Sequence, residues 1–137
     1  MPVVNELIKK ETDGSLSFGN YELAVKAKAE NFEYDGDLYK VKTYHEITKL
    51  ERNGMFVYES VPGTTVHHLC FTEKGLQFDV EGTGNPRITL ELEAEMEYKV
   101  MIDEVVAGTI KTNLGGKLVF STDFGNGGKA HVQIVRV

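Results

Sequence analysis

The chain has 137 residues, of which 15 are basic and 21 acidic, and its formal net charge is −6. The basic side chains are interleaved with acidic ones, as in residues 24–33 (AVKAKAENFE), whereas binding to a nucleic-acid backbone needs clustered lysine and arginine. The composition therefore argues against a nucleic-acid partner and favours one domain, residues 1–137, with a sizeable apolar core.

The first residues predict at most one short helix and no export signal. Val3, Val4, Leu7 and Ile8 share a helical face, and Pro2 suits a helix start. No apolar run resembles a secretory signal or approaches the roughly 20 residues that a membrane span requires. The single cysteine permits no internal disulfide, so we expect a cytoplasmic location without membrane contact; a non-classical export route stays open.

Most of the following chain alternates polar and apolar residues with a period of two, which is typical of strands with one buried face. Residues 22–29 (ELAVKAKA), 38–44 (LYKVKTY) and 90–102 show this alternation. Asp13-Gly14, Asp35-Gly36 and Asn53-Gly54 are dipeptides that type I′ hairpin turns prefer. We read residues 44–52 and 55–60 (MFVYES) as the two arms of a hairpin. Strands separated by short glycine-rich turns predict an all-β fold, an antiparallel β-sandwich of immunoglobulin-like or jelly-roll-like type.

Residues 61–70 (VPGTTVHHLC) hold two histidines and the cysteine. On a regular strand His68 and Cys70 share one face, and His67 lies on the other face with Leu69. His68 and Cys70 are an alternative pair of zinc ligands, which His45 or His131 would have to complete, and Cys70 is also an alternative nucleophile. The favoured interpretation is an ordinary strand with no metal and no cofactor, in which the cysteine is a small buried apolar residue.

Residues 92–102 carry a recognisable corner pattern. Leu92, Ala94 and Tyr98 resemble the tyrosine corner of fibronectin type III and related immunoglobulin-like sandwiches, with Ala94 where proline is usual. This resemblance implies that the ring of Tyr98 packs in the core while its hydroxyl bonds back to the backbone near the corner.

Four segments carry a second resemblance that extends over nearly the whole chain: residues 13–23, 38–67, 78–82 and 88–95. Through them the chain resembles small bacterial proteins labelled endosialidase or endosialidase-like. The resemblance implies a glycan-acting enzyme as one alternative for the function.

The residues themselves argue against sialidase chemistry. A sialidase holds the sugar carboxylate with three arginines and uses a tyrosine–glutamate pair as nucleophile. Here Arg52, Arg87 and Arg136 belong to separate turns and ends of the chain, and the adjacent Tyr58 and Glu59 point to opposite faces of a strand. We therefore expect no catalytic residues and favour a non-enzymatic binding or assembly module with a carbohydrate or protein ligand.

Aromatic side chains in residues 32–44 and 55–60 motivate the binding hypothesis, since aromatic rings are favoured at sugar and protein interfaces. For Phe32, Phe56 and Phe78 the favoured alternative is that the ring fills the core. The predicted ligand-binding candidates are Tyr34, Tyr39, Tyr44, Tyr58 and Arg52.

The last strand predicts self-association. Residues 130–137 (AHVQIVRV) are apolar on both faces near the end and contain no proline that would block pairing. Such a strand either inserts between other strands or meets a partner chain. Taking residues 130–137 and 55–60 as candidate edges, we expect a homo-oligomer with the C-terminal strand near the interface.

Overall fold

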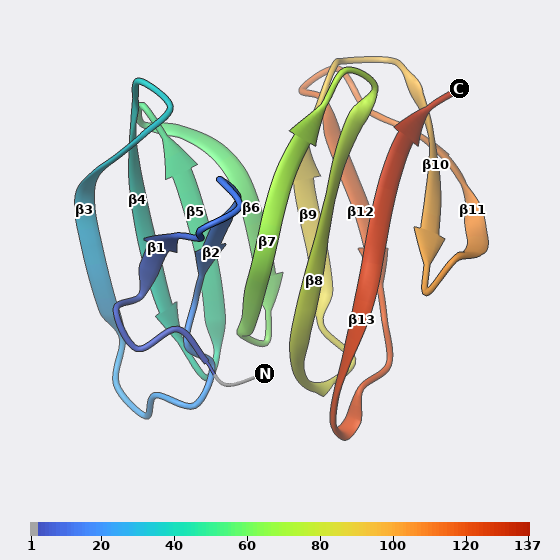
Figure 1. Ribbon diagram of the computed structural model, residues 1–137. Helices are drawn as coiled ribbons and strands as arrows, with labels where there is room; N and C mark the ends of the chain where they lie inside the picture. Colours follow the sequence, from blue (N-terminus) through green and yellow to red (C-terminus); the bar gives the residue numbers. More distant parts are fainter. Residues whose placement is uncertain (1–2) are drawn as a thin grey trace.

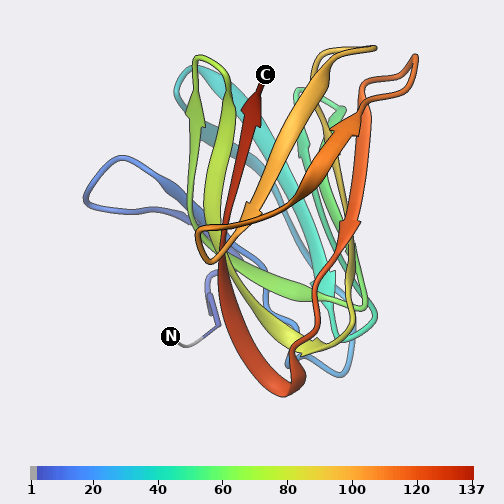
Figure 2. The same ribbon diagram turned by 90° about the vertical axis from the view of Figure 1, so that its right-hand side faces the viewer.

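The computed structural model describes residues 3–137 and contains two antiparallel sheets packed face to face, which confirms the all-β sandwich (Figure 1). We call the seven-stranded layer sheet A; its strand order is β1 (Ile8–Lys10), β2 (Leu16–Phe18), β7 (Thr64–Thr72), β8 (Gly75–Gly84), β13 (Gly125–Arg136), β10 (Glu97–Ile102) and β11 (Val105–Lys111). Sheet B has the order β12 (Lys117–Ser121), β9 (Arg87–Glu91), β6 (Met55–Val61), β5 (Ile47–Arg52), β4 (Asp37–Tyr44) and β3 (Ala27–Tyr34). The hairpin formed by β1 and β2 projects away from the two layers (Figure 2).

Two of the three predicted type I′ turns are confirmed. Both residues of Asp35-Gly36 have positive φ (50° and 81°), as do those of Asn53-Gly54 (52° and 80°). The prediction for Asp13-Gly14 is wrong, because only Gly14 has a positive φ (91°). The loop there is longer: Glu11 N–H donates to the carbonyl of Ser15, and Gly14 N–H donates to that of Glu11.

Three predicted elements differ from the structure. Only the end of the segment 22–29 is a strand, since β3 begins at Ala27 and Val25 is 77% exposed. Residues 3–9 form no helix, because Val4 N–H bonds to the carbonyl of Gly19 and β1 starts at Ile8; Pro2 lies outside the described residues. The alternation of residues 90–102 does not belong to one strand, since β9 ends at Glu91 in sheet B and β10 begins at Glu97 in sheet A. The connection between them leaves Met96 on the surface, although its parity predicts burial.

The predicted tyrosine tie is present at this crossover. Tyr98 is buried in the core, and its hydroxyl oxygen accepts a hydrogen bond of 3.2 Å from the backbone N–H of Glu93. The bond satisfies a backbone donor where the chain passes between sheets and no ladder partner is available.

The predicted edge strands are wrong. β13 pairs with β8 on one side and with β10 on the other, and β6 lies between β5 and β9. The C-terminal strand thus inserts between two other strands, as the first of the two alternatives for residues 130–137 predicted, and it does not form an edge that could meet a partner chain. The outermost strands are β1 and β11 in sheet A and β12 and β3 in sheet B.

A hydrogen-bonded polar cluster lies in the interior where β6 crosses to β7. The hydroxyl of Thr64 lies 2.7 Å from the Tyr58 hydroxyl and 2.7 Å from that of Ser60. Thr48 Oγ1 lies 2.9 Å from Thr43 Oγ1 and donates to the carbonyl of Thr64. All five side chains are buried, and burial raises the pKa of Tyr58 well above its usual range. The cluster satisfies polar groups that would otherwise destabilise the core.

Residues 3–137 include no helix whose length and apolar character would suit it to cross a membrane.

Candidate functional site

Three of the predicted ligand-binding tyrosines lie inside the sandwich. Tyr34, Tyr39 and Tyr58 belong to the core cluster, and their rings pack edge to face against neighbouring aromatic rings. Tyr44 is partly exposed, and its hydroxyl donates to Glu46. Arg52 lines an open groove, so the predicted set is not brought together at one surface.

We call this open space the end groove. It lies at the end of the sandwich that carries the turn between β7 and β8 and the C-terminus, the upper end in Figure 1. Its volume is about 450 Å³. The lining comes from both sheets and consists of Arg52, Asn53, Met55, Phe56, Val57, Phe71, Thr72, Glu73, Lys74, Gly75, Glu91, Leu92, Glu93, Tyr98 and Arg136.

Arg52 is oriented by two aromatic residues. Its guanidinium carbon lies 5.1 Å from the centroid of the Phe71 ring, and it hydrogen-bonds to the hydroxyl of Tyr39. Burial raises the pKa of Tyr39, and the hydrogen bond from Arg52 opposes that rise. A stacked guanidinium keeps the planar edge of N–H donors that suits oxygen ligands. Phe71 is 40% exposed, so an apolar surface lies next to these donors.

The other charges of the end groove are mostly paired. Arg136 donates to Glu93 at 3.0 Å, and Lys117 forms an ion pair with Glu91. Lys117 Nζ also lies 4.1 Å from the ring centroid of Phe56. Phe56 lines the groove, so the prediction that its ring fills the core is wrong. Phe78 is buried in the core as predicted. Phe32 is partly buried and packs against the core cluster.

The sequence predicted that the three arginines lie apart from one another, but two of them line the same groove. Arg52 at the end of β5 and Arg136 at the end of β13 both line the end groove, because two strands of different sheets finish at the same end of the sandwich. Arg87 begins β9 and does not line the groove. Only two of the three arginines therefore share a surface.

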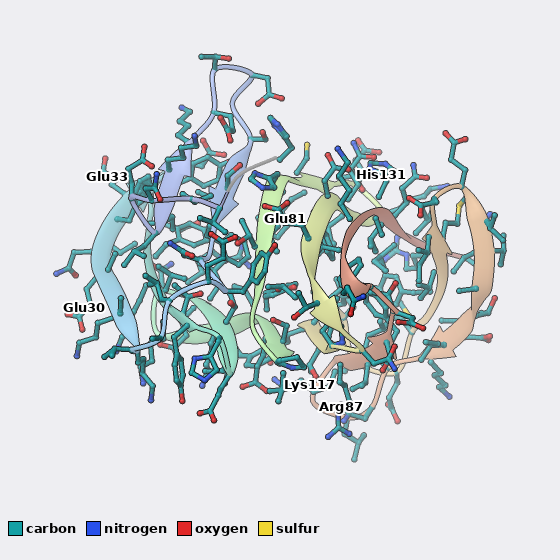
Figure 3. All side chains as sticks on the ribbon, turned by 90° about the horizontal axis from the view of Figure 1, so that it is seen from below. Glu30, Glu33, Glu81, Arg87, Lys117 and His131 are labelled. Atoms are coloured by element: carbon teal, nitrogen blue, oxygen red, sulfur yellow. The ribbon has the colours of Figure 1, made fainter. Side chains whose placement is uncertain are left out.

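A second concave region of about 380 Å³ lies over β7, β8 and β13 of sheet A. We call it the histidine recess; its lining consists of His67, His68, Asp79, Val80, Glu81, Asp103, Lys129, Ala130 and His131. Figure 3 places Glu81 and His131 on one side of the molecule, with Arg87 and Lys117 on the opposite side.

A β-bulge creates the recess. The register of β7 with β8 shifts between His67 and Cys70, and His68 has a φ of 58°. A bulge places two adjacent side chains on the same side of a strand. Val66 and Leu69 therefore both enter the core while His67 and His68 both line the recess, so the predicted sharing of a face by His67 and Leu69 is wrong.

Two histidine–carboxylate pairs organise the recess. His131 Nδ1 lies 2.7 Å from Asp79 Oδ1, across the paired strands β13 and β8. His67 Nε2 lies 3.3 Å from Glu81 Oε1. Asp103 bridges to the backbone of His131, since its carboxylate accepts from the His131 N–H and its own N–H donates to the His131 carbonyl.

The structure provides no third ligand beside the alternative zinc ligands His68 and Cys70 among the described residues. His68 Nδ1 lies 3.0 Å from Ser15 Oγ and 3.4 Å from Asp13 Oδ2, on the projecting hairpin, while Cys70 is exposed where burial was predicted. Hydrogen bonds from the Ser15 hydroxyl and N–H hold the pKa of Asp13 below its ordinary value. Among the residues that the structure describes, no group of three or more histidine, cysteine, aspartate or glutamate side chains is placed to hold a metal ion.

The recess was not predicted, although a signal for part of it exists. Asp79 and Glu81 alternate with the core residues Phe78 and Val80, which indicates a charged outer face on this strand. The strands beside β8 could not be identified from the sequence, because the pairing of β8 with β13 joins residues about 50 positions apart.

No protein-family model matches the chain, and neither the curated proteins nor the solved structures contain a significant match to it.

Proposed function

We propose that the protein is a non-enzymatic binding module that takes a carbohydrate in the end groove. The observation that carries this proposal is the position of Arg52, held by Phe71 and Tyr39 beside a 40% exposed phenyl ring in an open groove.

The groove combines the two kinds of surface that a sugar needs. A pyranose ring presents apolar C–H faces and a periphery of hydroxyl groups, each of which donates and accepts hydrogen bonds. Phe71 and Met55 supply apolar contact, Arg52 supplies planar donors, and Glu73 supplies oxygen acceptors.

We expect Arg52→Gln to weaken carbohydrate binding about tenfold to 150-fold, since hydrogen bonds to charged groups contribute about 1.5–3 kcal/mol. The measurement is a titration of wild-type and variant protein, by calorimetry, with the glycans that bind in an array of neutral and acidic oligosaccharides. Arg87→Gln is the matched control, because Arg87 is exposed at the start of β9 and does not line the groove.

Two outcomes would contradict this proposal. An equal loss of affinity in the Arg52 and Arg87 variants would show that only overall charge matters. Reproducible turnover of polysialic acid or another glycan in the panel would support the alternative, a glycan-acting enzyme.

Assembly is the second candidate function, and the exposure of β11 favours it. This outer strand of sheet A carries Val105 and Val106 at 69% and 54% exposure, and its one charged residue is Lys111 at the end. Antiparallel pairing with β11 of a second copy would bring Lys111 beside Glu104 of that copy on both sides of a two-fold axis. The strand is thus complementary to itself in charge.

We expect a dimer by light scattering coupled to size exclusion, and monomers for both Ala107→Glu and Ala107→Lys. Ala107 is exposed in the middle of β11 and lies directly beside the two-fold axis when Lys111 faces Glu104 of the second copy, so like charges would meet there. Mixing the two variants should restore a dimer, because opposite charges then face each other. Lys28→Glu on the outer strand β3 is the control and should leave the mass unchanged. A wild-type monomer at 100 µM (roughly the upper range for weak specific dimers) would refute self-association.

A further inference from the structure

The start of β13 carries an asparagine–glycine pair in an irregular stretch of the ladder. The register of β13 with β8 shifts between Gly125 and Gly128, so Asn126 and Gly127 together face one residue of β8 in a β-bulge. Residues 125–129 are all exposed, and the glycines on both sides of Asn126 let the backbone rotate easily. The bulge lies at the lower end of β13 in Figure 1, at the opposite end of the sandwich from the end groove.

The side-chain amide of Asn126 is not held by the fold. It makes no hydrogen bond to any of residues 3–137. The backbone N–H of Gly127 donates to the carbonyl of Phe124 at 3.0 Å, and this one bond has to open before the Gly127 nitrogen can turn toward the Asn126 side chain. A free asparagine amide followed by a glycine nitrogen, which has no neighbouring Cβ to obstruct it, is the arrangement in which asparagine reacts with its own backbone.

The second asparagine–glycine pair of the chain, Asn53-Gly54, is restrained by contrast. Asn53 Oδ1 accepts from the N–H of Leu38 at 2.9 Å, and Asn53 Nδ2 donates to Asp37 Oδ1 at 2.9 Å. The pair also forms the two-residue turn between β5 and β6, so rotation of its backbone would open that hairpin. Both polar atoms of the Asn53 amide are therefore held against β4.

We propose that Asn126 is a site of spontaneous deamidation, whereas Asn53 is protected by its hydrogen bonds. The backbone nitrogen of Gly127 attacks Cγ of Asn126 and forms a C–N bond, while its proton passes through water to the amide nitrogen, which leaves as ammonia. Water then adds to either carbonyl carbon of the resulting succinimide and opens the ring to aspartate or isoaspartate. Each modified chain gains one negative charge at the bulge. The site lies apart from the end groove and does not depend on the carbohydrate hypothesis.

The test follows both asparagines in the same protein sample. The folded wild-type chain is incubated in mildly alkaline buffer, and mass spectrometry of its proteolytic peptides measures the conversion of amide to acid at Asn53 and at Asn126 over time. We expect Asn126 to convert about tenfold faster, because two side-chain hydrogen bonds and a closed hairpin turn must open at Asn53 against one backbone bond at Asn126. In urea the two rates should become similar, since each asparagine precedes a glycine.

Two variants test the physical cause. Asn126→Gln should abolish the reaction at this position, because the longer side chain would have to close a less favourable six-membered ring. Asp37→Ala removes one of the two bonds that hold Asn53 and should speed its conversion about fivefold, with no change at Asn126. Equal rates at Asn53 and Asn126 in the folded wild-type chain, or an unchanged rate at Asn53 in Asp37→Ala, would overturn the proposal.

Discussion

Replacing Gly63 with alanine is expected to lower the free energy of unfolding by about 3–5 kcal/mol, the range of the most disruptive single substitutions. A Cβ at this position would lie 2.1 Å from the carbonyl oxygen of Tyr44. The obstacle is backbone and cannot rotate away, and the same loop is held by the hydrogen bond from Gly63 N–H to the carbonyl of His45. Relief requires moving the crossover from β6 to β7 away from β4, which would disturb the polar cluster beside it.

Urea denaturation measures this effect, with Gly108→Ala as the matched control. Gly108 lies in β11, and a Cβ there meets no atom within 4 Å. The control should change stability by less than about 1 kcal/mol, since removal of the flexible glycine favours folding slightly. Equal midpoints for the two variants would mean that the contact between the β6–β7 crossover and β4 is not rigid.

The second large effect is expected for Thr64→Val, which should cost about 2–4 kcal/mol. Valine preserves the shape of the side chain but removes the hydroxyl that both Tyr58 and Ser60 contact at 2.7 Å. Each buried polar group that loses its partner costs about 1–3 kcal/mol. Because the site lies between the two sheets, water cannot take the place of the lost hydroxyl without opening the core.

A double-mutant cycle separates the hydrogen bonds from the packing. Thr64→Ser retains the hydroxyl and should cost only about 1 kcal/mol for the lost methyl group. Tyr58→Phe combined with Thr64→Val removes both partners of one bond, so the double variant should be less destabilised than the sum of the two single variants. Strict additivity would show that Tyr58 and Thr64 do not depend on each other.

Much of the architecture follows from local sequence. Alternation of apolar residues and the dipeptides Asp35-Gly36 and Asn53-Gly54 predict strands and hairpins, and the structure has them, because side-chain period and positive φ are properties of a few neighbouring residues. The tie from Tyr98 to Glu93 spans five residues and could be predicted for the same reason.

The candidate surfaces depend on tertiary structure. Arg52 was a predicted binding residue, but Phe71, which it contacts, and Arg136, which lines the same groove, belong to other strands that reach the same end of the sandwich. The pairing of β8 with β13 brings Asp79 to His131, and the bulge at His68 turns His67 toward Glu81. A bulge reverses the facing of every later residue in a strand, and alternation in the sequence carries no record of it.

The same limit explains the C-terminal strand. The face with Val132 and Ile134 was predicted from residues 130–137 alone and is buried in the core, whereas Val137 is 69% exposed. Sequence by itself determined that this segment is a strand with an apolar face, because the pattern of side chains decides burial, and pairing with β8 and β10 satisfies the backbone groups on its two edges. Which strands cover it, and therefore which strand is left exposed at the edge, was decided only by the long-range pairing of the folded chain.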